Sequence, residues 1–145
     1  MDNEGLTMSD RDEIIDLTIA YTWAIDDKRV EDLSNIFLPN ATALLRGREC
    51  NGVEQIIARI GGSVRRFEVT QHLIGNHQVR VDGDRATCRC QLHSQHTIAG
   101  FEGGENYTIG GMYLDELVRT DNGWRISHRE MRQTWAEGNE ALLGG

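Results

Sequence analysis

Two stretches of this chain carry residues suited to acid–base chemistry. Asp26 lies in YTWAIDDKRVEDL, at the end of an amphipathic helical pattern, and His72 lies in VTQHLIGNHQVRVDGDRATC, where a long strand pattern begins. A fixed carboxylate can orient an imidazole, and an oriented neutral imidazole is a good proton acceptor near pH 7. If the fold joins the two, the sequence predicts a small acid–base enzyme. Asp27 is the competing acid, because it is adjacent in sequence.

Composition narrows the class of protein. The chain has 145 residues, of which 39% are hydrophobic and 26% charged, as expected for one globular domain. Its net charge of −8 argues against nucleic acid and anionic membranes as partners, but leaves room for a small-molecule substrate in a pocket. No apolar run approaches the ~18 residues of a membrane span, and the acidic N-terminus is unlike a secretory signal. We therefore expect a cytoplasmic location.

The elements that must position Asp26 and His72 follow from hydrophobic periodicity. Residues 1–8 are expected to be disordered. Helices are predicted from Ser9, as N-cap, to residue 25, over 30–37 before Pro39-Asn40, and over 53–60 before two glycines. A strand is predicted at 41–47, followed by strands near 66–81, 85–98, 107–119 and 124–134. A single domain is thus expected over 9–135, with a flexible tail at 136–145.

Helices followed by antiparallel strands indicate an α+β fold. We expect three N-terminal helices on a strongly curved, mainly antiparallel sheet that encloses a pocket, forming a cone-shaped α+β barrel. Val69, Leu73 and Val79 are expected on an exposed sheet face that favours self-association. Cys50, Cys88 and Cys90 are expected to be free and buried. Neither these cysteines nor the histidines have the spacing of a zinc site, so no metal is predicted.

The motifs also carry a family likeness. AIDDKRVEDLSNIF, GRECNGVEQI, TQHLIGNHQVRVDGDRA and GGMYLDELVRTDNGWRISHR resemble the SnoaL-like branch of the nuclear-transport-factor-2-like superfamily. Within that branch the chain is similar to scytalone dehydratase and hexachlorocyclohexane dehydrochlorinase. The resemblance implies a cone of three helices on a curved sheet, a dimer or trimer, and neither a metal nor an organic cofactor.

The resemblance also implies roles for particular residues. An Asp at the end of the first helix and a His entering a long strand form the catalytic dyad of these enzymes, which places the dyad at Asp26 and His72. An Arg after the last-strand Trp contributes in the dehydrochlorinase and corresponds to Arg129, and a second His of scytalone dehydratase corresponds to His96. The dehydrochlorinase has a Lys on its first helix where this chain offers Tyr21. This departure argues against a chloride leaving group handled in the same way and leaves a dehydratase as an option.

The faces of the strands qualify these roles. His96 shares the small and apolar face of its strand and should reach the pocket. Trp124 and Ile126 should point inward, which would turn Arg129 outward unless a bulge intervenes. Tyr21 could donate a phenolic proton or merely pack. Five residues are expected to line the core or the substrate pocket: Trp23, Phe67, Leu92, Met112 and Tyr113.

The leading hypothesis is a cofactor-independent lyase or isomerase. His72 would abstract a proton from carbon in a small, largely apolar substrate, while Asp26 orients His72 and stabilises its charged form. Tyr21, His96 or Arg129 would stabilise the developing oxyanion or the leaving group. One alternative is a non-catalytic ligand-binding or assembly module of the same fold. Another is polyketide cyclisation or epoxide hydrolysis, the latter requiring Asp115 or Glu116 to join Asp26 in the pocket.

Overall fold

The computed structural model describes residues 8–144. Three helical segments come first or interleave with the first strands: α1 (Asp10–Asp26), η1 (Val30–Asn35) and α2 (Val53–Val64). The strands are β1 (Phe37–Leu45), β2 (Arg48–Asn51), β3 (Val69–Asp82), β4 (Arg85–Thr97), β5 (Asn106–Thr120) and β6 (Gly123–Gly138), and η2 (Glu140–Leu143) closes the described chain. The predicted disorder of residues 1–8 falls, apart from Met8, outside the described residues.

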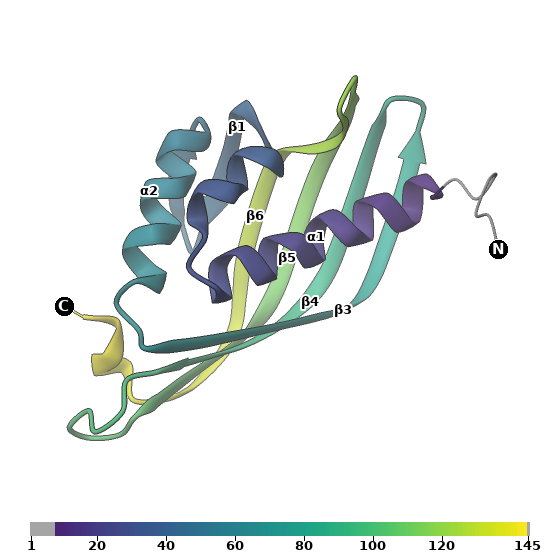
Figure 1. The fold of residues 1–145 in the computed structure, drawn as a ribbon. Helices are drawn as coiled ribbons and strands as arrows, with labels where there is room; N and C mark the ends of the chain where they lie inside the picture. Colours follow the sequence, from purple (N-terminus) through teal and green to yellow (C-terminus); the bar gives the residue numbers. More distant parts are fainter. Residues whose placement is uncertain (1–7, 145) are drawn as a thin grey trace, which may run out of the picture.

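The strands form one six-stranded sheet in the order β2-β1-β6-β5-β4-β3. All neighbours are antiparallel except β1 and β6, which run parallel. The sheet curves strongly around α1, which lies across its inner face, while α2 lies beside β1 (Figure 1). The predicted α+β fold of helices on a curved, mainly antiparallel sheet is confirmed, although the sheet is not closed into a barrel.

Helix α1 begins at the predicted N-cap. The Ser9 hydroxyl accepts a hydrogen bond from the Asp12 backbone N–H at 3.1 Å, and acidic residues in the first turn favour the positive end of the helix dipole. Its buried face holds Ile14, Thr18, Tyr21, Thr22, Ala24 and Ile25. This face fixes α1 against the sheet and brings its last residue, Asp26, over β3.

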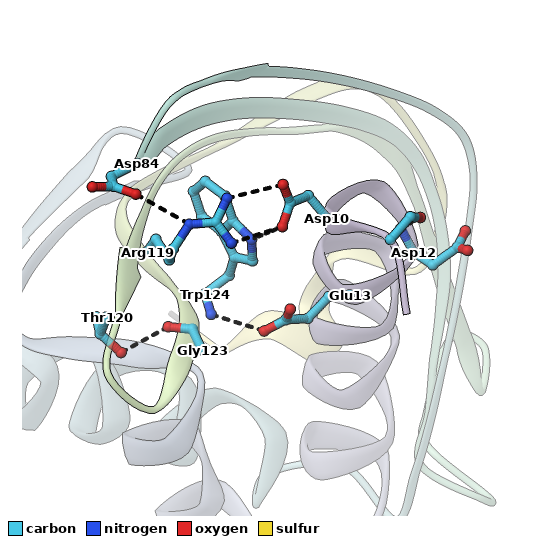
Figure 2. A network of polar contacts seen from close by, with 9 residues as sticks. Asp10, Asp12, Glu13, Asp84, Arg119, Thr120, Gly123 and Trp124 are labelled. Atoms are coloured by element: carbon cyan, nitrogen blue, oxygen red, sulfur yellow. Dashed lines mark hydrogen bonds and ion pairs between the residues drawn. The ribbon is translucent and has the colours of Figure 1, made fainter. Parts of the chain in front are cut away.

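The first turn of α1 is also tied to the β5–β6 hairpin (Figure 2). Arg119 makes two hydrogen bonds with the Asp10 carboxylate, at 2.8 and 2.9 Å, and a third with Asp84 at 3.1 Å. The Trp124 indole N–H donates to Asp10 at 3.1 Å, and its backbone N–H donates to Glu13 at 3.0 Å. Both ends of α1 are therefore held by contacts with residues distant in the sequence.

The inner face of the sheet carries the core. Along β4 the burial alternates with period two, so that Cys88, Cys90 and His96 are buried while Arg89 and His93 are exposed. All three cysteines are free and buried, as predicted. No helix within residues 8–144 is long and apolar enough to cross a membrane.

Two irregularities change which residues face inward. In β3 the pairing with β4 shifts between Gly75 and Gln78, where Asn76 has a left-handed φ of 56°. In consequence Val79 packs toward the core and not on the outer face predicted for it, whereas Leu73 is exposed. The pairing between β5 and β6 also shifts: Glu116 pairs with His128, but the next residue, Leu117, pairs with Ile126. Ser127 is therefore an extra, unpaired residue in β6. The bulge that Arg129 required is therefore present.

Two helix boundaries differ from the prediction. The segment predicted as a helix over 30–37 is a 3-10 helix that ends at Asn35, and β1 begins at Phe37 and passes through Pro39. Pro39 is tolerated because it lies where the β1–β6 register shifts, between Phe37 and Thr42. Helix α2 continues through both predicted stop glycines to Val64. A Cβ on Gly61 would lie 2.7 Å from Nη1 of Arg65, the flexible end of an exposed side chain that can move aside.

Two ordered segments were not predicted. Strand β2 pairs with β1 through a tight turn at Arg46-Gly47. The expected flexible tail at 136–145 is corrected over 136–144: β6 continues to Gly138, and η2 follows with Leu142 fully buried. The Asn139 side chain accepts the Ala141 backbone N–H at 3.1 Å and so caps η2. Hydrogen bonds from Arg66 to the Leu142 carbonyl and from the Asn139 amide to the Glu102 and Gly104 carbonyls also hold this segment, which has no periodic pattern in the sequence.

Candidate active site

His72 and Asp26 form a hydrogen-bonded pair. His72 Nδ1 lies 2.6 Å from Asp26 Oδ1, and the His72 backbone N–H donates to Oδ2 at 2.8 Å. Their side chains are only 8% and 16% exposed, respectively. Because an ionised carboxylate only accepts hydrogen bonds, Nδ1 carries the proton and Nε2 of the neutral ring carries a lone pair.

The Asp26 carboxylate is held by a third donor, the Thr70 hydroxyl, at 2.9 Å from Oδ1. Burial favours a raised pKa for Asp26, but the hydrogen bonds from His72 and Thr70 outweigh burial and lower this pKa. Asp26 is therefore ionised at neutral pH. Asp27, the competing acid, points away, is half exposed and pairs with Arg29 at 3.3 Å.

A cavity of about 100 Å³ opens beside His72, between α1, α2 and the sheet. Its wall combines apolar side chains with two imidazoles, two phenols, two guanidinium groups and two serine hydroxyls. The lining residues are Tyr21, Ile25, Leu45, Arg46, Arg59, Ile60, Ser63, Val64, His72, Leu92, Ser94, His96, Ile109, Tyr113 and Met131. Of the predicted site residues, the structure therefore brings Tyr21, His72, Leu92, His96 and Tyr113 to one cavity.

His96 faces His72 across the cavity wall. Their ring centroids are 5.8 Å apart in an edge-to-face arrangement. His96 Nδ1 lies 3.1 Å from the Tyr107 carbonyl oxygen, so Nδ1 must donate and Nε2 carries no proton in the neutral ring. Burial, and next the nearby His72, lower the pKa of His96 to about 4. The ring is therefore a neutral hydrogen-bond acceptor at pH 7.

Arg129 is fully buried but does not line the cavity. Its guanidinium makes two hydrogen bonds of 2.7 Å with Asp115 and lies 4.3 Å from the ring centroid of Tyr21 and 4.0 Å from that of Tyr113. Burial raises the pKa of both tyrosines, so their hydroxyls stay protonated. Arg129 and Asp115 thus form an ion pair beneath the two phenols that line the cavity.

Of the residues predicted to line the core or the pocket, Trp23 and Met112 lie elsewhere, and Phe67 belongs to the core without lining the cavity. Trp23 is 62% exposed, because it lies ~200° around the helix from Tyr21. Met112 is on the outer face of β5, since neighbouring residues of a strand point to opposite faces and Tyr113 points inward. Phe67 is core: its ring supports His96 from behind at a centroid distance of 4.9 Å.

The sequence reasoning missed four polar residues of the site. Thr70 lies two positions before His72 and therefore on the same inner face of the strand, a spacing from which its contact with Asp26 could have been predicted. Arg46, Arg59 and Ser63 line the cavity from the β1–β2 turn and from α2. Arg46 adjoins a strand and Ser63 lies in a helical turn that were not predicted, whereas Arg59 lies within the predicted helix but was given no role there. Among residues 8–144 no group of three His, Cys, Asp or Glu side chains is placed to hold a metal ion.

Comparison with known sequences agrees with this architecture. Residues 6–130 match the SnoaL-like domain family, and the chain belongs to this family. The uncharacterized protein Rv2910c of Mycobacterium tuberculosis is 36% identical over 129 residues, covering 84% of each chain. The terrestric acid biosynthesis cluster protein E of Penicillium crustosum is 27% identical over 143 residues, covering 94% of this chain and 91% of that protein.

Solved structures share the fold. The Kfla4162 protein of Kribbella flavida is 29% identical with a TM-score of 0.86, covering 94% of this chain and 97% of the other. A putative scytalone dehydratase of Novosphingobium aromaticivorans is 20% identical with a TM-score of 0.78, covering 88% and 86%. The hexachlorocyclohexane dehydrochlorinase LinA-type3 of Novosphingobium barchaimii is 20% identical with a TM-score of 0.78, covering 90% of each chain.

Proposed function

We propose that this protein is a cofactor-independent lyase or isomerase, dehydratase-like in its chemistry, that abstracts a proton from carbon in a small substrate. The observation that carries the proposal is the His72–Asp26 hydrogen bond of 2.6 Å beside a cavity that His72 lines. The bond leaves His72 Nε2 as a free base on the cavity side of a ring whose tautomer is fixed. The name of the Penicillium relative, a biosynthesis cluster protein, is consistent with a small-molecule substrate.

The proposed step begins with transfer of a proton from substrate carbon to His72 Nε2. The electrons of the broken C–H bond form a C=C bond, and in a dehydration the C–O bond to a neighbouring hydroxyl breaks. The imidazolium then returns its proton to the departing oxygen, which leaves as water; in an isomerisation it returns the proton to another carbon. Asp26 stabilises the imidazolium during the step, because its carboxylate already accepts the Nδ1 hydrogen bond.

The two tyrosine hydroxyls are the proposed hydrogen-bond donors that stabilise negative charge on the substrate. Tyr21 and Tyr113 line the cavity with protonated hydroxyls, which can donate to a substrate carbonyl or enolate oxygen. The Arg129 cation lies over both rings and stabilises negative charge that develops near their hydroxyls. In this arrangement His96 accepts a hydrogen bond, from a substrate hydroxyl, and does not act as the oxyanion donor.

The paired-carboxylate alternative has less geometric support. Both Asp115 oxygens are bound to Arg129, and Glu116 lies on the exposed outer face of β5. Neither carboxylate lines the cavity beside His72. A second acid to activate water opposite Asp26 is therefore not available in this arrangement, which argues against epoxide hydrolysis.

The experiment follows carbon–hydrogen cleavage directly. A panel of small ketones and β-hydroxy ketones is incubated in D₂O, and NMR records α-proton exchange while absorbance records enone formation. We expect His72→Ala to abolish exchange and Asp26→Asn to reduce it by about 10²–10⁴-fold, with both variants folded. His93→Ala, on the exposed face of β4, is the control and should keep full activity. Equal exchange rates in wild type and the His72 variant would overturn the proposal.

A further inference from the structure

Three arginines gather at the rim of the cavity in an otherwise acidic protein. Arg46 and Arg59 line the cavity that holds His72, and the charge of Arg48 acts on Arg59. The chain as a whole has a net charge of −8, so a local group of cations is unusual here. Within residues 8–144, none of the three guanidinium groups makes an ion pair or a side-chain hydrogen bond.

Arg59 is placed unfavourably for an unliganded protein. Its Nε is buried and has no hydrogen-bond partner among the described residues. Burial, and then the charges of Arg48 and Arg46, lower the pKa of its guanidinium. A buried donor without an acceptor and three neighbouring like charges both destabilise the fold. An anion at the rim would relieve both.

The backbone conformation of Arg46 is a second indication of a functional role at the rim of the cavity. Arg46 has a φ of 50° and Gly47 a φ of 79°, the left-handed pair of a two-residue hairpin turn. Asn, Asp and Gly adopt this left-handed conformation most readily, whereas it is unfavourable for a residue with a long side chain such as arginine. Left-handed residues other than glycine cluster at functional sites, where the surrounding structure enforces them. Here the turn places a guanidinium on the wall that His72 and His96 share.

We propose that the substrate is a carboxylic acid, whose carboxylate binds Arg46 and Arg59 at the rim while the reacting carbon faces His72. The proposal rests on the proposed function and specifies its substrate class. A planar guanidinium matches a carboxylate with two parallel hydrogen bonds, and Arg48 adds positive potential. Ser63, which lines the same cavity from α2, offers a further hydroxyl donor. Attachment at the rim and reaction at the dyad orient the substrate along the cavity.

The test measures binding, separately from turnover. Calorimetric titration compares benzoate with its neutral analogue benzamide on wild type, Arg46→Asn, Arg59→Met and the control Arg80→Met, which alters an exposed outer-face arginine. We expect benzoate to bind wild type and Arg80→Met at least about tenfold more tightly than benzamide, and each cavity variant to lose about tenfold in benzoate affinity. Arg46→Asn suits the turn, so its melting temperature should not fall.

Each remaining outcome decides the proposal. Equal affinity for benzoate and benzamide, no benzoate binding at millimolar concentration, or unchanged benzoate affinity in Arg46→Asn and Arg59→Met would overturn it. Inorganic phosphate that competes with benzoate at equal affinity would refute the carboxylate class and leave a general anion site. Repeating the titrations in His72→Ala separates the two proposals: arginine-dependent benzoate binding there supports the anion site even if His72 proves inert in the exchange assay.

Discussion

Protonation of His96 should make the stability of this fold depend on pH. The ring is buried, donates to the Tyr107 carbonyl, and has a pKa lowered from 6.5 to about 4, chiefly by burial and then by His72. Arg46 also lowers this pKa and Asp26 raises it. The unfolded chain binds a proton at His96 below about pH 6.5, whereas the folded chain does so only near pH 4. Stability is therefore full above the unfolded pKa and is lost as the pH falls through this window.

The magnitude follows from the width of the window. A displacement from 6.5 to about 4, at about 1.4 kcal/mol per pH unit, corresponds to about 3 kcal/mol of unfolding free energy. In a domain of this size such a loss lowers the melting temperature by about 6–12 °C. Below about pH 4 the contribution of His96 no longer changes, because both states then carry the proton.

Urea unfolding of wild type and His96→Gln between pH 7.5 and 4 measures this contribution. The variant should lose about 3 kcal/mol less stability than wild type over that range, whatever its stability at pH 7.5. Titrating groups that do not act on His96 are common to both proteins and cancel in the difference, whereas His72 and Asp26 interact with His96. His93→Gln, on the exposed face of the same strand, should keep the wild-type pH dependence. Parallel curves for wild type and His96→Gln would refute the reasoning.

Two further predictions concern the floor of the cavity and two glycines. Asp115→Asn should destabilise the fold by about 3–5 kcal/mol in urea unfolding, because it leaves the buried Arg129 without its counter-ion. The Asp115→Leu/Arg129→Met double variant should recover much of that loss, because it removes both charges. Equal losses of unfolding free energy in the two variants would contradict this account. Gly62→Ala should raise the unfolding free energy by about 0.5–1 kcal/mol, since a Cβ in α2 meets nothing within 4 Å. Gly111→Ala should lower it by about 1–3 kcal/mol, since its Cβ would lie 2.2 Å from the Arg132 carbonyl oxygen; the opposite order of melting temperatures would contradict both.

The fold class was predictable because its signals are local and repetitive. Period-two burial along β4 and the Ser9 cap of α1 can each be recognised within a dozen residues. The family motifs identified Asp26 and His72, and the structure places their side chains in hydrogen-bond contact. Their catalytic roles remain predictions, as do the homo-oligomer and the cytoplasmic location.

What the sequence did not predict depends on single residues that break a pattern. Ser127 is an extra residue in β6, and it alone decides that Arg129 points inward. Asn76 does the same for Val79 in β3. Arg46 was missed because it lies in a turn whose second strand, β2, is only four residues long. Tertiary packing also carries α2 past Gly61 and Gly62, overriding their low helix propensity.

The polar network at the first turn of α1 has a consequence for the order of folding. Its contacts join residues 109, 111 and 114 positions apart, whereas the Asp26–His72 bond spans 46. Closing such long loops is slow, so the contacts at the first turn of α1 form later in folding than the Asp26–His72 bond. On the ribosome, β3 can meet the end of α1 long before Arg119 and Trp124 are synthesised. Helix α1 is thus anchored first at its Asp26 end, and its first turn is held only when the last hairpin has formed.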